Sequence, residues 1–226
     1  MVIVFDLDDT LYDERTYVES GFRAVAAMGA ERFGWDAGKS FRFMVEVLER
    51  EGRGAVFDRW LAAFGRSGRG LVRECVRVYR HHEPDIRLYE EADALLDRLA
   101  GQPLYLVTDG HKVVQHRKVE ALGLQSRLRK VYITSRYGAR HAKPSIHCFE
   151  LIRARERCQW DDMVYVGDNP AKDFVNLNRQ GMHTVRVLTG CHRAVEALPG
   201  HDARRTIGSL RELESMLDEL KRGSKP

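Results

Sequence analysis

The chain begins with a short apolar run that leads directly into a cluster of acidic residues. Residues 2–5 (Val-Ile-Val-Phe) are apolar at every position, which is the pattern of a β-strand buried on both faces. Asp6, Asp8 and Asp9 follow at once. Carboxylates at the end of a buried strand need a cation to balance them, and Mg²⁺ prefers carboxylate, phosphate and water oxygens. The pattern therefore predicts a strand that ends in a magnesium site.

Two patterns of hydrophobicity divide the rest of the chain. Residues 16–82 carry four apolar stripes at helical spacing, separated by glycine-bearing breaks, with no convincing strand. After Pro84, short apolar runs alternate with amphipathic segments. The predicted strands are 104–107, 131–133, 163–166 and 184–187, and the predicted helices are 90–100, 112–122, 144–157, 171–180 and one opening at Ser209. This alternation predicts an α/β fold, a doubly wound parallel sheet of the Rossmann-like type.

The helical stretch interrupts this α/β pattern, because the first strand matches strands that occur only after residue 100. We therefore predict a Rossmann-like core formed by residues 1–14 and 84–226. Residues 15–83 would form an inserted all-α domain.

Composition narrows the class of protein and its partners. The net charge of +4 comes from 37 basic and 33 acidic residues spread along 226 positions, which disfavours nucleic acid as a partner. The four cysteines form no Cys-x-x-Cys pair, which favours reduced thiols and a cytoplasmic location. We see no signal peptide and no apolar stretch long enough to span a bilayer, so no membrane partner is expected.

Three further predicted strands are followed by residues that suit phosphate or metal chemistry. Thr108-Asp109-Gly110 follows residues 104–107, and Gly167-Asp168-Asn169-Pro170 follows residues 163–166, with Asp173 close behind. Lys143 precedes Pro144 after the third strand, where we expect a helix to begin and its dipole to favour an anion. Ligands of parallel sheets bind beyond the carboxyl ends of the strands, so these residues are expected to converge with Asp6 and Asp8.

The four motifs, in this order and spacing, resemble those of the haloacid dehalogenase superfamily of phosphohydrolases. The insertion is similar to the helical cap of the phosphoglycolate phosphatase-like branch. The resemblance covers essentially the whole core, and it implies a magnesium-dependent phosphatase that acts on a small phosphorylated metabolite.

The resemblance also implies a role for each motif residue. Asp6 would be the nucleophile that becomes an aspartyl phosphate, and Asp8 the general acid and base. The implied phosphate ligands are Thr108, the N–H of Asp109, and Lys143. The implied magnesium ligands are Asp6, the backbone carbonyl of Asp8, and Asp168, supported from behind by Asp173 and Asn169.

The sequence departs from the family pattern at Asp109, where asparagine is usual. A second carboxylate facing a phosphate would repel it, so we expect the side chain to turn away and leave its N–H to bind. His111, directly after this turn, and Arg53, between two glycines of the insertion, are candidate contacts for substrate specificity.

Several other functions compete with the phosphatase. A dehalogenase does not need an acid at the position of Asp8, so the presence of Asp8 argues against that activity. A phosphonatase needs a lysine in the cap. The cap of this chain offers essentially Lys39, which lies in a polar stretch, so that activity is disfavoured. A phosphosugar mutase shares every core motif and stays open, as does a non-catalytic binding or regulatory module on the same fold. The sequence fixes neither the substrate nor the oligomeric state.

Overall fold

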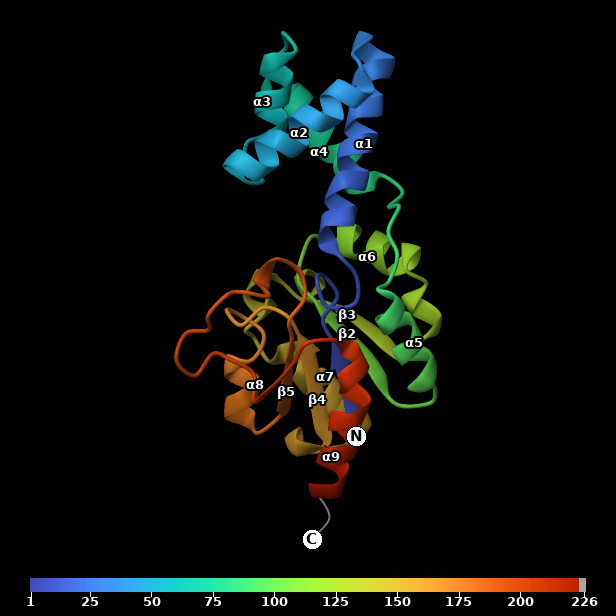
Figure 1. The fold of residues 1–226 in the computed structure, drawn as a ribbon, viewed down its shortest axis with the longest axis vertical. Coiled ribbons are helices and arrows are strands. Elements are labelled where there is room, and N and C mark those ends of the chain that lie inside the picture. Colours follow the sequence, from blue (N-terminus) through green and yellow to red (C-terminus); the bar gives the residue numbers. More distant parts are fainter. Residues whose placement is uncertain (224–226) are drawn as a thin grey trace. The chain divides into compact units, whose positions relative to one another are not determined.

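A computed structural model describes residues 1–223 of the chain (Figure 1). Contacts between Cα atoms divide it into two compact units. The core consists of Met1–Glu14 and Arg87–Pro226, of which the last three residues lie outside the described part, and the helical insert consists of Arg15–Ile86. Sequence analysis set the second boundary at residue 84 rather than 87. Each unit is considered by itself below.

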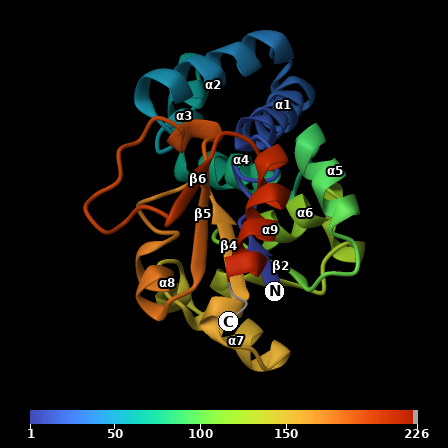
Figure 2. The ribbon, with the colours of Figure 1, turned by 60° about the horizontal axis from the view of Figure 1, so that its bottom comes forward.

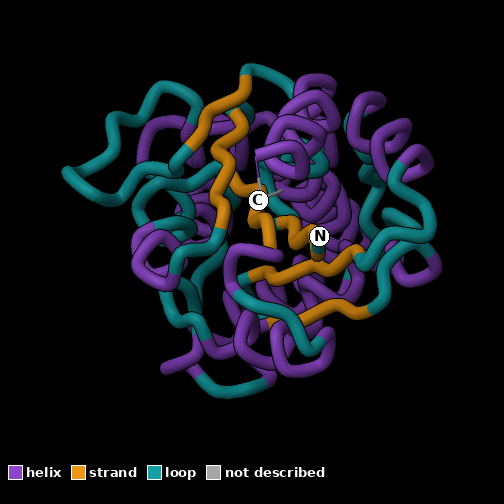
Figure 3. The backbone as a smooth tube through the Cα atoms, turned by 90° about the horizontal axis from the view of Figure 1, so that it is seen from below, coloured by secondary structure: helices purple, strands orange, loops and turns teal. Residues whose placement is uncertain are grey.

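The core contains one parallel sheet with the order β3-β2-β1-β4-β5-β6, and its strands lie side by side in Figure 3. The strands are β1 (Val2–Phe5), β2 (Leu104–Thr108), β3 (Lys130–Ile133), β4 (Met163–Gly167), β5 (His183–Val187) and β6 (Arg205–Ile207). This order reverses direction at β1, which has β2 on one side and β4 on the other. The end of β1 is therefore the place where a ligand is expected in a doubly wound sheet.

Helices cover both faces of this sheet, as the alternation of elements predicts (Figure 2). The helices of the core are α5 (Glu90–Arg98), α6 (Lys112–Ala121), α7 (His147–Glu156), α8 (Val175–Gln180) and α9 (Leu213–Gly223). Val4, Tyr105 and Tyr165 pack with α7 and α8 on one face. The central strands β1, β2 and β4 are buried at every position, so the sheet is covered on both faces.

The helical insert contains α1 (Glu14–Phe33), α2 (Ala37–Glu51), α3 (Val56–Ala63) and α4 (Arg69–His81), which agree with the four predicted stripes. The first residue of α1 belongs to the core unit. Trp60 and Met44 are fully buried in the apolar centre of the insert, together with Phe22. None of the helices within residues 1–223 is long and apolar enough to cross a membrane.

Some predicted elements were wrong at their boundaries. The helix predicted over 171–180 begins only at Val175, because the preceding residues form a turn in which the N–H of Asp173 donates to the carbonyl of Asn169. The short strand β6 at the sheet edge was missed, because only Ile207 of its three residues is buried. Ser209 does form the predicted capping box with Glu212, although it opens a short 3₁₀ turn ahead of α9.

Candidate active site

The nucleophile candidate Asp6 lies where β1 ends, between its two neighbouring strands. Its N–H donates to the carbonyl of Val166 at 2.8 Å, which continues the pairing of β1 with β4 by one residue. The residue is only 3% exposed. Asp168 follows β4 and accepts a hydrogen bond from the Thr10 hydroxyl at 3.4 Å, so the ends of β1 and β4 are joined through their acidic motifs.

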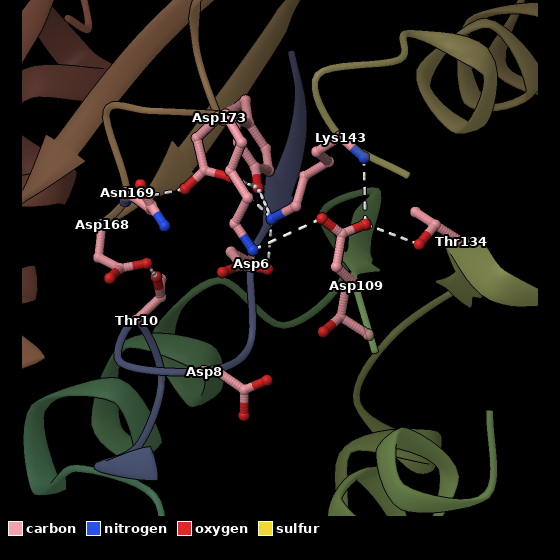
Figure 4. A network of polar contacts seen from close by, with 12 residues as sticks. Asp6, Asp8, Thr10, Asp109, Thr134, Lys143, Asp168, Asn169 and Asp173 are labelled. Atoms are coloured by element: carbon pink, nitrogen blue, oxygen red, sulfur yellow. Dashed lines mark hydrogen bonds and ion pairs between the residues drawn. The ribbon is translucent and has the colours of Figure 1, made fainter. Parts of the chain in front are cut away.

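Lys143 connects Asp6 to Asp173 inside the core (Figure 4). Its ammonium is 2.7 Å from Asp6 Oδ1 and 2.8 Å from Asp173 Oδ1, and its side chain is 1% exposed. It also donates to the Tyr165 hydroxyl at 2.9 Å, which donates in turn to Asp173. Although burial alone would lower the pKa of Lys143, the Asp173 and Asp6 carboxylates raise it well above its usual value. Lys143 is therefore a permanent cation beside the nucleophile candidate.

Asp6, Asp168 and Asp173 form a group of buried carboxylates that suits a metal ion. Each offers one oxygen, and these oxygens lie within 4.8 Å of one another. Burial raises the pKa of Asp6 to about 6 in spite of Lys143, and burial followed by the charges of Asp6 and Asp173 raises that of Asp168 to about 8. Three carboxylates thus meet one contacting ammonium, and a hard divalent cation with oxygen ligands fits this excess of negative charge.

The turn after β4 holds Asp173 in this group. The N–H of Asn169 donates to Asp173 Oδ2 at 2.9 Å. A Cβ atom at Gly167 would lie 2.6 Å from the same oxygen, so only glycine lets the Asp173 carboxylate pack against the strand end. The backbone of the Gly167-Asp168-Asn169 segment therefore carries the Asp168 carboxylate and also holds the Asp173 carboxylate in position.

Asp8 lies apart from the carboxylate group (Figure 4). It has a separate set of hydrogen-bond partners. Its Oδ1 accepts from the Tyr12 hydroxyl and from the Lys118 ammonium, both at 2.6 Å, and its Oδ2 accepts from Gln115 Nε2 at 2.9 Å. Burial opposes ionisation of Asp8, but the charge and hydrogen bond of Lys118, with the bonds from Tyr12 and Gln115, lower its pKa below the usual value. The two carboxylates that the sequence places two residues apart therefore have different surroundings.

The second motif lies at the end of β2. Thr108 is fully buried, and its hydroxyl oxygen accepts a hydrogen bond from Gln115 Nε2 at 2.6 Å. Asp109 Oδ1 accepts from the Thr134 hydroxyl at 2.6 Å and from the N–H of Lys143 at 3.1 Å, while its Oδ2 is 3.5 Å from the Lys172 ammonium. The carboxylate that replaces the usual amide is thus paired with a cation.

Lys143 does not stand at the start of a helix, and this part of the prediction was wrong. The helix α7 begins at His147, because residues 142–145 form a turn in which the N–H of Ser145 donates to the carbonyl of Ala142. The ammonium of Lys143 reaches Asp6 without help from a helix dipole. Its positive charge is the feature that suits a phosphate.

The two specificity candidates have different settings. His111 is exposed at the position before α6, three residues after Thr108. Arg53 is exposed in the helical insert, between α2 and α3. Their contact with a substrate stays a prediction.

Sequence reasoning missed several residues that contact the motifs, and two of them carried a visible signal. Gln115 and Lys118 share one face of α6 with Val119 and Leu122, at the spacing of a buried helical stripe. Polar residues at such positions require partners, which here are motif residues. Tyr165 gave no signal, because it reads as one more apolar strand residue. Lys172 gave none either, because a single lysine in a loop is usually solvated.

Comparison with known proteins supports these assignments of fold and class. A family model described as haloacid dehalogenase-like hydrolase matches residues 1–174, and a second, described as HAD-hydrolase-like, matches residues 141–213. A glyceraldehyde 3-phosphate phosphatase of Methanocaldococcus jannaschii is 29% identical over 97% of this chain and 98% of the relative. A glyceraldehyde 3-phosphate phosphatase of Methanopyrus kandleri is 30% identical over 96% of this chain and 97% of the relative.

A solved structure shares the fold. The HAD hydrolase YfnB of Bacillus subtilis superposes with a TM-score of 0.70 at 18% identity, covering 96% of this chain and 98% of that one. The match to the family model spans more than half of the chain and includes all four motifs. The chain belongs to the haloacid dehalogenase-like hydrolases and is a phosphoric monoester hydrolase.

Proposed function

We propose that this enzyme is a magnesium-dependent phosphatase that forms an aspartyl phosphate on Asp6. The observation that carries the proposal is the contact of Asp6 with Lys143 inside a group of three buried carboxylates. Phosphoryl transfer needs placement and charge neutralisation more than unusual side chains. A nucleophile beside a permanent ammonium and a cation site meets both needs.

The two half-reactions divide between Asp6 and Asp8. An Asp6 oxygen attacks phosphorus, the bond from phosphorus to the substrate oxygen breaks, and Asp8 gives its proton to the leaving alkoxide. Water then attacks the aspartyl phosphate, Asp8 takes a proton from that water, and the bond between phosphorus and Asp6 breaks to release inorganic phosphate. Thr108, the N–H of Asp109 and Lys143 would hold the phosphate oxygens.

Magnesium would be held by Asp6 and Asp168 with the backbone carbonyl of Asp8. Asp173 and Asn169 would support these ligands, since Asn169 binds Asp173 and Asp173 binds Lys143. When bound, the ion would neutralise the charge on the transferred phosphoryl group. The YfnB structure of B. subtilis was solved with magnesium, which supports the choice of ion.

We infer glyceraldehyde 3-phosphate, or a phosphorylated metabolite of similar size, as the substrate. The support is that the curated relatives bearing this activity in their names align with nearly the whole chain. We also infer a cytoplasmic location, because all four cysteines are free thiols, as is usual in a reducing compartment.

The test is a screen of the purified enzyme with Mg²⁺ against glyceraldehyde 3-phosphate and a panel of other phosphomonoesters, following release of inorganic phosphate. We expect turnover that disappears in Asp6→Asn and persists in Asp161→Asn, an exposed aspartate with no part in the site. Transfer of the phosphoryl group to a second sugar phosphate without net phosphate release would indicate a mutase instead. Turnover that survives in Asp6→Asn would refute the mechanism.

A further inference from the structure

The face of α6 turned toward the motifs carries two buried polar residues that the proposed mechanism does not use. Gln115 is 1% exposed and Lys118 is 2% exposed. A buried lysine loses most of its hydration, so a folded chain retains one only where its charge is matched. Lys118 finds Asp8 at 2.6 Å and Glu14 at 3.4 Å. The charge of Lys118 is therefore balanced by Asp8 in the loop after β1 and by Glu14 at the start of α1.

Gln115 links two motifs through a single amide nitrogen. Its Nε2 donates to Asp8 Oδ2 at 2.9 Å and to the Thr108 hydroxyl oxygen at 2.6 Å. Both of its amide hydrogens are thus used, one on the acid–base candidate and one on the phosphate-binding candidate. A Cβ at Gly110 would lie 3.0 Å from Gln115 Cγ and Cδ, so the second motif is also closely packed around this amide.

Together these contacts fix the Asp8 carboxylate completely. Tyr12 and Lys118 hold Oδ1, and Gln115 holds Oδ2. Three donors on two oxygens define both the rotation of the carboxylate and its distance from Thr108, which no single contact could do. Two of the three donors, Gln115 and Lys118, sit on the helix α6, so their positions are set by the packing of that helix rather than by a loop.

We propose that Lys118 and Gln115 are positioning residues that orient Asp8 toward the oxygen of the leaving group. The proposal deepens the proposed phosphatase function and rests on it. Neither residue would touch the substrate. Lys118 would act through Asp8, and Gln115 would act through Asp8 and through Thr108, whose hydroxyl it also binds. Their removal should therefore impair protonation of the leaving group and leave the attack by Asp6 largely intact.

The test compares two substrates of nearly the same shape, phenyl phosphate and 4-nitrophenyl phosphate. The phenolate of the first needs a proton to leave, whereas the nitrophenolate of the second needs little help. The ratio of kcat/KM for the two substrates reports the first half-reaction alone. In Lys118→Met we expect kcat/KM for phenyl phosphate to fall roughly 10- to 100-fold, a share of the usual contribution of acid catalysis, with a much smaller loss for 4-nitrophenyl phosphate.

Further variants separate positioning from a general loss of structure. Gln115→Met should also lower kcat/KM for phenyl phosphate relative to 4-nitrophenyl phosphate. Lys118→Arg, which keeps the charge, should lower this ratio less than Lys118→Met does. Asp8→Asn should show the full change, and Asp8→Asn/Lys118→Met no more than Asp8→Asn alone, because Lys118 acts through Asp8. Lys130→Met and Gln102→Met, at exposed positions away from the carboxyl ends of the strands, are the matched controls and should leave the ratio unchanged.

Each result decides the matter. Equal losses on both substrates, no loss on either, or a further change in the double variant would overturn the proposal. Equal losses would indicate a general structural role, no loss would mean that Asp8 is oriented without Lys118, and a further change would mean that Lys118 does not act through Asp8 alone. If Lys118→Met does not fold, Gln115→Met and Lys118→Arg give the same comparison. A wild-type enzyme that hydrolyses neither compound nor any metabolite of the panel would instead refute the phosphatase function itself.

Discussion

Within residues 1–223, the core contains two buried lysines, and their networks differ in how the charges are balanced. Lys143 contacts Asp6 and Asp173, and Asp168 lies within the same carboxylate group. Lys118 contacts Asp8, which also accepts two hydrogen bonds from neutral donors. The pKa of Asp6 is accordingly raised by burial to about 6, whereas that of Asp8 is lowered by Lys118 and its other donors against the effect of burial.

This difference indicates in which of the two networks side chains of the protein alone balance the carboxylate charge. The Asp8 carboxylate is fully provided with donors by one loop and one helix. The three carboxylates around Lys143 outnumber its single ammonium, and this excess of negative charge suits an added cation. Two carboxylates in different environments are a recurring basis for different roles in one reaction. We therefore expect added metal and single substitutions to affect the two networks unequally.

The largest effect is expected when a carboxylate is removed from the group around Lys143. Asp168→Asn should lower kcat by roughly 10²- to 10⁴-fold and raise the Mg²⁺ concentration needed for half-maximal activity at least about tenfold, because a proposed metal ligand is lost. Glu14→Gln, which removes a carboxylate from beside Lys118, should leave the magnesium requirement unchanged. Magnesium titrations of activity give both values. A shift of the same size in both variants would contradict the comparison.

A smaller effect is expected on stability when either lysine is removed. Lys143→Met should lower the free energy of unfolding by about 3–5 kcal/mol, because the buried Asp6 carboxylate loses its partner. Lys118→Met should lower it by less, because the side chain of its partner Asp8 is 22% exposed. Saturating Mg²⁺ should then stabilise Lys143→Met more than the wild type, because an ion at the proposed site would offset the charge that the lost ammonium balanced. It should stabilise Lys118→Met no more than the wild type. Urea unfolding with Mg²⁺ and with a chelator measures these increments, and equal increments in all three proteins would remove the distinction.

The fold could be predicted from the sequence, but much of the difference between the two lysine networks could not. The apolar run of β1 and the strand–helix alternation predicted the parallel sheet, since a strand buried on both faces has a clear pattern. Asp6, Lys143 and Asp168 were predicted to converge because the carboxyl ends of parallel strands meet at one edge.

What the sequence did not predict are contacts decided by side-chain packing. The Asp8 network depends on the rotation of α6, which turns Gln115 and Lys118 inward, and no strand-end rule predicts that rotation. The start of α7 was misplaced because proline in a first helical turn is also common in a plain turn. Motif residues are thus easier to predict than the side chains that hold them.

The smallest effect is expected at Asp109, whose ion pair with Lys172 is partly exposed, at 17% and 34% of the respective side chains. Asp109→Asn keeps an oxygen for Thr134 and the N–H of Lys143 but removes a negative charge beside the phosphate site. It should tighten competitive inhibition by inorganic phosphate by roughly two- to fivefold, the equivalent of about 0.5–1 kcal/mol, and Lys172→Met should weaken it by a similar factor. Lys130→Met is the control. A change in the inhibition constant above about tenfold would mean that this pair acts as strongly as the buried networks. Solvent exposure would then not explain the difference between this pair and those networks.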